Sequence, residues 1–434
     1  MKREMKFDGS TAGANNYLLL KTLQSGSGID HGNELGYNTA MVKYVMPDDW
    51  VRYDIGAVVQ QLMVARATML SLSQIPLQRN WADEMQRVQL KREVAGTSRI
   101  EGAEFTEREL DAAMVQTPEQ LETRSQKQAA AAKRTYDWIA GLQSDRPVDA
   151  DLIKEVHRKI VTGADDDRCE PGVLRPRDVN VTFGSPPHRG AEGGEECAQA
   201  FAGLCLALEH EFRRHDPLVQ AIALHYHFAA IHPFLDGNGR TARALEALML
   251  QRVGLPGMLF IAMSNYYYEN KPAYLEALAT TRAGGHDLTP FLRFGLRGIE
   301  MQCSRMFAEV RKNVSRALFR NMMYDLYDRL KSTRKRVIAQ RQLEILKLLL
   351  GADAMMLDEI EQRTRAHYVR LGNPRKAFIR DISYLLQLRA IGFRREAEKN
   401  VMFAELDWPT RITETEFFQS VKNMPKAKTS GFLT

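Results

Sequence analysis

Twelve consecutive residues carry several groups that act on phosphates. The segment His232–Arg243 reads His-Pro-Phe-Leu-Asp-Gly-Asn-Gly-Arg-Thr-Ala-Arg. Its Gly-Asn-Gly loop precedes a predicted helix, and backbone N–H groups at such a helix start form an anion site suited to phosphates. Arg240 and Arg243 are three residues apart, so they are neighbours on one helical face and can hold a polyphosphate from one side.

Two further side chains of this segment extend the chemistry. Asp236 lies at the mouth of the loop, where a carboxylate beside phosphates can hold Mg²⁺. His232 lies four residues earlier, and imidazole is well suited to accept a proton near pH 7. Singly, each feature has a structural explanation, because Gly-Asn-Gly is usually a turn and two such arginines usually form a solvated face. Together they predict phosphoryl or nucleotidyl transfer.

Two helices must position this segment. An apolar helix over Ala221–Ala230 leads into it and is broken by Pro233, and a second helix begins at about Arg240. His225 and His227 lie on the first helix. Together with His232 they resemble a metal-ligand set, but their place on an apolar helix favours core packing.

The remaining pattern is that of a mainly α fold. Thr106–Glu109 has the pattern of a capping box that opens a helix. A long helix is expected from about Glu119, after Pro118, to Trp138, and another over Ala150–Val161. Residues 163–194 are rich in glycine and proline around one β-type stretch, Val179–Phe183, which predicts a small hairpin or flap. Helices resume at about Glu195 and continue past residue 330.

The C-terminal region has the layout of a winged helix-turn-helix. Arg336–Pro409 contains three predicted helices and then two short strands, at Gln340–Leu350, Leu357–Gln362, Lys376–Leu388, 392–394 and Val401–Ala404. Eleven Lys or Arg residues against three acidic ones lie between Arg305 and Arg341. The third predicted helix and the two strands add further cations, namely Arg375, Lys376, Arg380, Arg394 and Arg395. Three acidic residues reduce the positive charge of this surface, namely Asp381, Glu396 and Glu398. This net positive charge favours binding to the phosphates of a DNA backbone, but winged helices also dock proteins or form dimers.

The bulk composition is that of an ordinary globular protein. The 434 residues are 44% apolar and 26% charged, with a net charge of +6. The cysteines Cys169, Cys197, Cys205 and Cys303 contain no C-x-x-C pair, which favours reduced thiols in a cytosolic compartment. The apolar run Tyr17–Leu20 is too short for a signal peptide, and no run approaches the ~20 residues of a membrane span. We expect a cytoplasmic protein without a membrane partner.

The twelve-residue segment resembles the signature of Fic proteins, His-Pro-Phe-x-Asp-Gly-Asn-Gly-Arg-x-x-Arg, without a departure. The resemblance extends over roughly residues 90–300, with a flap-like region near Pro171–Arg175 and the segments Leu259–Asn270 and Ala273–Leu278. It implies an enzyme that moves AMP from ATP to a Ser, Thr or Tyr hydroxyl of a target protein or of itself.

The resemblance also implies residue roles. His232 would deprotonate the hydroxyl that attacks the α-phosphorus of ATP and expels pyrophosphate. Asp236 would hold Mg²⁺, and the buried Phe234 would fix the loop. Tyr266 and Tyr267 would be walls of the adenine pocket, although tyrosines at helical spacing are more often core residues. The phosphate-binding residues would be Gly237, Asn238 and Gly239 for the α- and β-phosphates, and Arg240 and Arg243 for the β/γ end.

A second pattern upstream suggests inhibition. Many Fic proteins carry an inhibitory helix of pattern Ser/Thr-x-x-x-Glu-Gly/Asn, and Thr97, Glu101 and Gly102 match it. Paired with Arg243, the Glu101 carboxylate would occupy the place of the ATP γ-phosphate. Displacement of the reacting atoms by about 1 Å can cost ~10²-fold in rate. The resemblance therefore predicts an autoinhibited enzyme.

These predictions combine into one architecture. The expected parts are an N-terminal helical region with the inhibitory helix (1–120), the Fic core (121–300), a basic helical linker (301–335), the winged helix (336–410) and a tail (411–434). The flap would align the target segment as an added strand. Alternatives are a Fic-type enzyme that uses another phosphate-containing donor or removes AMP, and a nucleotide-sensing DNA-binding regulator. DNA and a second copy of the chain are candidate partners.

Overall fold

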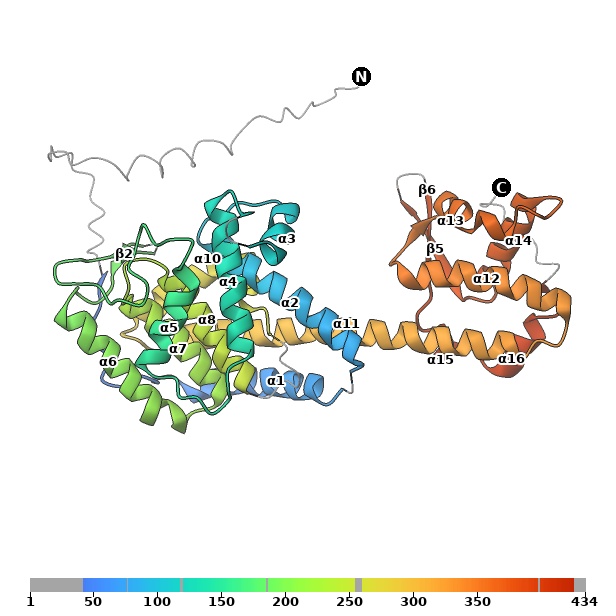
Figure 1. Ribbon diagram of the computed structural model, residues 1–434. Coiled ribbons are helices and arrows are strands. Elements are labelled where there is room, and N and C mark those ends of the chain that lie inside the picture. Colours follow the sequence, from blue (N-terminus) through green and yellow to red (C-terminus); the bar gives the residue numbers. More distant parts are fainter. Residues whose placement is uncertain are drawn as a thin grey trace, which may run out of the picture. The chain divides into compact units, whose positions relative to one another are not determined.

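The computed structural model describes residues 42–424 except residues 76, 118–119, 185, 254–259 and 397–398. The fold is mainly α, as predicted, with short strands (Figure 1). The first part contains α1 (Ile55–Ser73), α2 (Arg79–Ile100), α3 (Glu107–Val115), α4 (Arg124–Ala140), α5 (Ala150–Val161), α6 (Glu195–His210), α7 (Pro217–Ile231), α8 (Asn238–Arg252), α9 (Met263–Glu269) and α10 (Lys271–Ala283), followed by α11 (Thr289–Asp328).

One hydrophobic core joins these helices around α7. The side chains of α7 are buried from Leu218 to Ile231 apart from the partly exposed Gln220. Helix α7 packs against α6, α8 and α11. The predicted boundary at residue 120 is not a structural one, because Val58 of α1 and Val94 of α2 are buried in the same core as α7.

Helix starts follow their local chemistry. The predicted capping box is confirmed, since the Thr106 and Glu109 side chains bond each other's backbone N–H groups. The next helix begins at Arg124 and not near Glu119, because a second capping box at Thr123 supplies the start. Pro118 and Glu119, like residues 1–41 and Leu259, lie outside the described residues.

The predicted flap is a three-stranded sheet of short strands. Its order is β1 (Val42–Lys43), β3 (His188–Arg189), β2 (Thr182–Phe183), with β1 parallel and β2 antiparallel to β3. The predicted strand over Val179–Phe183 is reduced to its last two residues. A side-chain donor replaces the sheet ladder there, because the Arg175 guanidinium donates to the Val179 carbonyl at 2.7 Å.

Helix α11 belongs to two hydrophobic cores. Its N-terminal part buries Phe291 and Ile299 in the first core, and its C-terminal part buries Phe319 and Met323 in a second. The predicted linker over residues 301–335 is therefore wrong as a separate part. The apolar side chains of the helix continue at i, i+4 spacing beyond residue 318 and supply one wall of the second core.

The second core follows the predicted order of elements. Between the first and second of the predicted helices the structure adds the short strand β4, which pairs with β6, and the sheet order is β4-β6-β5. Part of the predicted tail is also packed, since Phe417 and Met424 are buried in this core. Glu398 and residues 425–434 lie outside the described part. The elements are α12 (Thr333–Gly351), β4 (Met355–Met356), α13 (Leu357–Thr364), α14 (Pro374–Gln387), β5 (Ile391–Glu396), β6 (Lys399–Ala404), α15 (Trp408–Arg411) and α16 (Glu414–Ser420).

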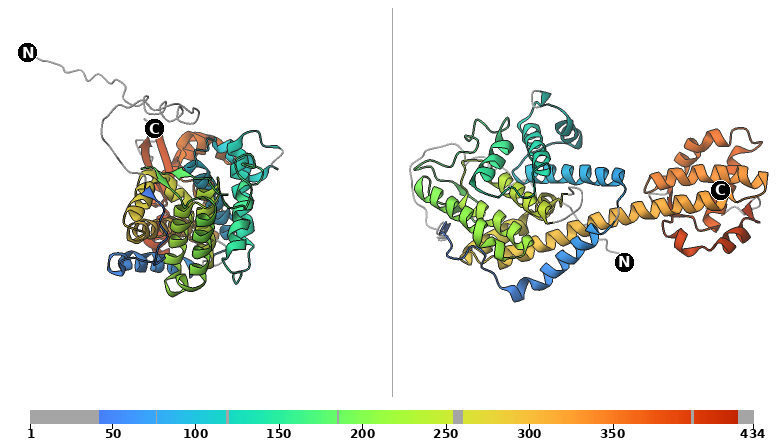
Figure 2. Two further views of the ribbon diagram at one scale, coloured as in Figure 1. Left: turned by 90° about the vertical axis from the view of Figure 1, so that its left-hand side faces the viewer. Right: turned by 60° about the horizontal axis from the view of Figure 1, so that its bottom comes forward.

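Helix α1 is an exception to the expectation that no segment of the chain is long and apolar enough to span a membrane. Over the described residues it is the one helix long and apolar enough to cross a bilayer, with a mean hydropathy of 1.4 and 22% of the window buried. It packs against α11 (Figure 2). Its Arg66 forms an ion pair with Asp216 at 2.8 Å.

The contact between α2 and α9 leads to a stability prediction. A Cβ atom at Gly96 would overlap the backbone of Ser264 and Asn265, which cannot move as a flexible side chain can. We expect Gly96→Ala to lower the free energy of unfolding by about 1–3 kcal/mol, because overpacking forces backbone shifts. Urea denaturation followed by circular dichroism measures it. Gly351→Ala is the matched control, since its Cβ meets nothing within 4 Å. Equal effects of the two substitutions would contradict the prediction.

Candidate functional site

The predicted segment forms the turn between α7 and α8. His232 ends α7 in the left-handed conformation, with φ 54° and ψ 58°. That conformation costs a non-glycine residue about 1 kcal/mol, and such strain is concentrated at functional sites. Helix α8 begins at Asn238, slightly before the predicted Arg240. Its N-cap, Gly237, has φ 76°, and a Cβ there would lie 2.5 Å from Val161 Cγ1, so both conformation and space require glycine.

Asn238 and Phe234 fix the shape of the turn. The Asn238 side chain accepts from the Phe234 N–H at 2.9 Å and donates to the Phe234 carbonyl at 2.8 Å. Phe234 is fully buried and stacks on His157 with ring centroids 3.7 Å apart. The side chain of Asn238 is therefore committed to the loop itself. The backbone N–H groups at the start of α8 are the part of this loop suited to an anion.

His157 is a positioning residue that sequence reasoning missed. Its Nδ1 accepts from the Gly172 N–H at 2.9 Å, so its Nε2 carries the proton and donates to the Asp236 carbonyl at 2.9 Å. Burial lowers its pKa to about 4, which keeps the ring neutral. A lone histidine on the predicted helix Ala150–Val161 gives no signal of this role, because its partners are far away in sequence.

The His232 imidazole is arranged as a proton acceptor. Its Nδ1 lies 3.2 Å from the Ala229 carbonyl, an acceptor that fixes the proton on Nδ1 and leaves the Nε2 lone pair available. Burial lowers the pKa to about 4, only partly offset by the Ala229 carbonyl. The ring stacks on Phe183 of the flap at 3.8 Å. His232 is thus a neutral base at physiological pH.

A buried arginine joins the flap to this turn. Arg175 is 2% exposed, and its guanidinium donates to the carbonyls of His232 at 2.8 Å, Val179 at 2.7 Å and Ala191 at 2.5 Å. Its backbone N–H bonds the Pro233 carbonyl at 2.9 Å. The flap and the base are therefore held by one side chain. The sequence places Arg175 in the expected flap region but gives no signal of this role.

Arg240 is engaged with a carboxylate that the sequence did not reveal. Its Nη1 lies 2.5 Å from Asp165 Oδ2, and both side chains are buried. Its Nη2 is 3.8 Å from Asp236 Oδ1. Gln128 donates to the other Asp165 oxygen at 2.9 Å. The predicted contact of Arg240 with the β/γ phosphates would therefore add to an existing buried ion pair.

Arg243 connects α8 to α2. Its Nη2 lies 2.6 Å from Glu101 Oε1, its Nε donates to Thr97 Oγ1 at 2.9 Å, and the side chain is 1% exposed. Burial opposes ionisation of Glu101, but Arg243 outweighs it and lowers the pKa of that carboxyl. The same carboxylate lies directly against Gly239, where a Cβ would overlap Oε1. Gly102, with φ 89°, follows as the turn that ends the helix.

The position of α2 depends on a second buried carboxyl, Glu93, which was not predicted. It accepts from the Ser264 N–H at 2.8 Å, from the Ser264 hydroxyl, and from the Tyr136 hydroxyl at 2.9 Å. Burial raises its pKa to about 7 against the lowering effect of these donors. Glu93 and Glu101 thus anchor the two turns of α2 nearest the site.

The two predicted adenine-pocket tyrosines occupy core positions. Tyr267 is fully buried, and its hydroxyl donates to Glu246 Oε1 at 2.6 Å. Tyr266 is 3% exposed, and its ring centroid lies 5.0 Å from that of Phe294. This placement agrees with the core alternative. His225 has partners of the same kind, since its Nδ1 lies 2.7 Å from Glu246 Oε2.

Asp236 fits the requirements of a magnesium ligand. Its side chain is 33% exposed at the loop mouth, and its Oδ1 accepts from the Gly237 N–H at 2.6 Å. Arg168 Nη1 lies 3.6 Å from Oδ2. Mg²⁺ typically takes one or two carboxylates together with substrate phosphates and waters, so a single accessible carboxylate beside an anion loop is sufficient.

This part of the chain is similar to proteins of a known family. Residues 147–250 match the model of the Fic/DOC family. Protein adenylyltransferase Fic of Nematostella vectensis is 33% identical over 159 residues, which are 37% of this chain and 34% of that protein. The chain thus covers about a third of the length of this relative.

Two solved structures share the fold. A Fic family protein from Desulfovibrio desulfuricans G20 matches with a TM-score of 0.52 and 18% identity, covering 82% of this chain and 98% of that one. Fic-1 from C. elegans matches with a TM-score of 0.50 and 21% identity, covering 60% and 74%. The helices and the glycine-rich turn define a Fic-type fold. Residues 147–250, which match the Fic/DOC family model, include the turn.

The lowered pKa of His232 gives a prediction for its titration. A histidine with its pKa lowered to about 4 stays neutral through the range in which free imidazole titrates, near 6.5. We expect its Cε1–H resonance in NMR spectra, assigned with His232→Gln, to shift with a midpoint near pH 4. Between pH 6.5 and 4 only the unfolded chain binds this proton, so the group lowers stability as pH falls. A midpoint above pH 6 would contradict the arrangement.

Proposed function

We propose that this chain is a protein adenylyltransferase that moves AMP from ATP to a Ser, Thr or Tyr hydroxyl of a target protein or of itself. The observation that supports this most is a neutral His232, its Nε2 free, beside the start of α8. The Nematostella vectensis relative is itself named as a protein adenylyltransferase.

The proposed reaction is an in-line transfer at the α-phosphorus. The target hydroxyl gives its proton to His232 Nε2 as its oxygen bonds to that phosphorus. The bond from the α-phosphorus to the bridging oxygen breaks, and pyrophosphate leaves. Backbone N–H groups of Gly237–Gly239 would hold the phosphates, Asp236 would hold Mg²⁺, and Arg243 would bind the γ end. When bound, Mg²⁺ supplies positive charge that offsets the phosphate charge.

The proposal includes inhibition by Glu101. Its carboxylate lies 2.6 Å from Arg243 Nη2 and against Gly239, which is the space that the γ-phosphate would need. Two anions cannot share one guanidinium in this buried place without strong repulsion. ATP would therefore bind with its terminal phosphates displaced and its α-phosphorus out of line with the hydroxyl.

Removal of the carboxylate tests this proposal. We expect Glu101→Gly to raise self-labelling from α-labelled ATP by about 10- to 100-fold, because in-line geometry is restored. The substitution lies at the C-cap of α2 and not in its interior, so the helix should persist. Glu104→Gly, at an exposed position just beyond the helix, is the matched control and should leave labelling unchanged. Labelling that does not rise in Glu101→Gly would reject the inhibitory role.

The same assay separates the alternatives. Adding His232→Ala to Glu101→Gly should abolish transfer, whereas undiminished transfer would place the base elsewhere. Mass spectrometry of the product distinguishes AMP from UMP, phosphate or phosphocholine. Loss of AMP from a previously modified protein would favour the reverse reaction. Nucleotide binding without any transfer would favour a nucleotide-sensing regulator.

We also propose that the second core is a DNA-binding winged helix. The order α12, β4, α13, α14 and the β5–β6 ribbon supports the assignment. Three cations near the start of α14 are exposed, namely Arg370, Arg375 and Lys376. Arg375 is paired with Glu361 at 2.5 Å, which leaves Arg370 and Lys376 as the stronger candidates for phosphate contacts.

A gel-shift assay tests DNA binding. The chain should retard a duplex at low salt, and Arg370→Gln with Lys376→Gln should weaken binding at least tenfold, because phosphate contacts dominate affinity. Arg293→Gln with Arg297→Gln removes two exposed cations of α11 as a charge-matched control. No retardation of any duplex at low salt, or equal loss in both double variants, would reject the assignment.

A further inference from the structure

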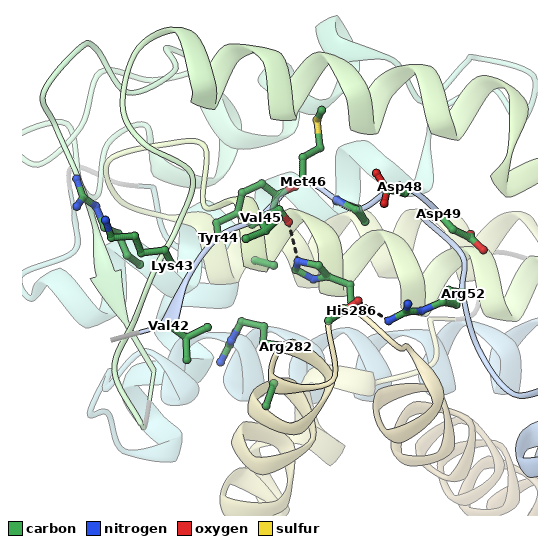
Figure 3. Close-up of a pocket in the computed structure, with 15 residues that line it drawn as sticks. Val42, Lys43, Tyr44, Val45, Met46, Asp48, Asp49, Arg52, Arg282 and His286 are labelled. Carbon is green, nitrogen blue, oxygen red and sulfur yellow. Dashed lines mark hydrogen bonds between the residues drawn. The ribbon is translucent and has the colours of Figure 1, made fainter. Parts of the chain in front are cut away.

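A cavity lies beside the flap. It has a volume of about 330 Å³ and is formed by β1 and the residues that follow it, by Arg189 of β3, by Ala230 of α7, and by the end of α10 (Figure 3). His286 lines it and bonds the Val45 carbonyl at 2.8 Å. Neither the proposed transfer reaction nor its inhibition uses this cavity.

Arg282 links the cavity to the base. Its Cζ atom lies 5.7 Å from the centroid of the Phe183 ring, and Phe183 stacks on His232 at 3.8 Å. The Arg282 Cζ atom therefore lies within roughly 10 Å of the His232 ring. About three residues of an extended chain span that distance. A side chain held by Arg282 would belong to a residue close in sequence to the acceptor hydroxyl.

The cavity also holds cationic and donor groups that remain unpartnered within the described part of the chain. No hydrogen bond or ion pair joins Arg282 to another described residue, and burial lowers its pKa only to about 10, so it stays charged. The buried Tyr44 hydroxyl and Arg189 Nε have no partner among these residues either. Lys43 is a further cation of the lining, Arg52 bonds the Gly284 and Gly285 carbonyls, and Asp48 and Asp49 carry the opposite sign.

We propose that this cavity receives an acidic side chain of the target segment, within three residues of the acceptor hydroxyl. The inference rests on the proposed adenylyltransferase function and names a substrate class for it. A carboxylate accepts from a guanidinium and from hydroxyl and N–H donors at once, which matches the unpartnered groups of the cavity. Asp48 and Asp49 would repel an anion, so the carboxylate would lie at the Arg282 side. Arg282 is then a specificity-determining residue.

Peptide pools test the inference in the Glu101→Gly background. Each pool has one Ser, Thr or Tyr acceptor among random residues, with Glu, Gln or Lys fixed at one position up to three residues away. We expect Glu pools to be labelled about tenfold more than Gln pools when the fixed residue is at one or more of these positions. A tenfold preference corresponds to a free-energy difference of about 1.4 kcal/mol. Arg282→Glu should reverse the preference and favour Lys pools, a gain that a misfolded variant cannot produce. Arg320→Gln, an exposed cation of α11, should keep the Glu preference.

The outcomes separate this inference from the function on which it rests. Equal labelling of the three kinds of pool, a Glu preference that survives Arg282→Glu, or self-labelling without labelling of any Glu pool would overturn the acidic-residue site. The transferase proposal would stand in each of these cases. Absence of all AMP transfer, including self-labelling, would instead overturn the transferase proposal and this inference with it.

Discussion

A buried guanidinium must be paired, and much of this site follows from how Arg243 is paired. The side chain is 1% exposed, so leaving it without an anion would be very costly. Glu101 supplies the charge and Thr97 supplies two further acceptors, a hydroxyl and a carbonyl. This requirement brings the C-terminal turn of α2 onto the start of α8. Whatever anion competes for Arg243 must displace these groups or lie beside them.

Two other buried arginines hold the remaining sides of the turn. Arg240 of α8 is fixed by Asp165, and Arg175 is fixed by backbone carbonyls of the flap and of the turn itself. Carbonyl oxygens carry only a partial negative charge. Several hydrogen bonds to them are therefore needed to offset the cost of burying the Arg175 guanidinium. Arg175 consequently bonds both the base and the flap, and a left-handed His232 is tolerated because its surroundings determine its position.

The sequence alone indicates the contiguous part of the candidate site, whereas the distant partners emerge only from the fold. His232, Asp236 and the Gly-Asn-Gly turn lie in one segment, and their spacing carries the chemistry. Asp165, His157, Glu93 and Phe183 were missed, because each acts through a partner that only the tertiary fold brings near. Glu101 was named through resemblance to a family, since an acidic residue near a helix end is by itself uninformative.

The fold shows the same division between local and distant information. The capping box at Thr106 and the bounds of α5 were predicted correctly, because side chains within a few residues set them. Helix α11 was divided too early, because its charge pattern suggests a linker while its buried face continues into the second core. Tyr266 and Tyr267 show the same limit, since helical spacing alone does not distinguish a pocket wall from a core residue.

The buried Glu93 carboxyl has a consequence for the proton balance of the molecule. Its pKa is about 7 in the fold and near 4.5 in a free carboxyl, so between these values the folded chain binds a proton that the unfolded chain has released. Folding in this range therefore takes up a proton at Glu93, and the contribution of this residue to stability declines as pH rises from 4.5 towards 7. The hydroxyls of Ser264 and Tyr136 can rotate to accept from the neutral acid, whereas the Ser264 N–H can only donate. The heat of folding should thus depend on the ionisation enthalpy of the buffer, with α2 anchored by a group that is half protonated at neutrality.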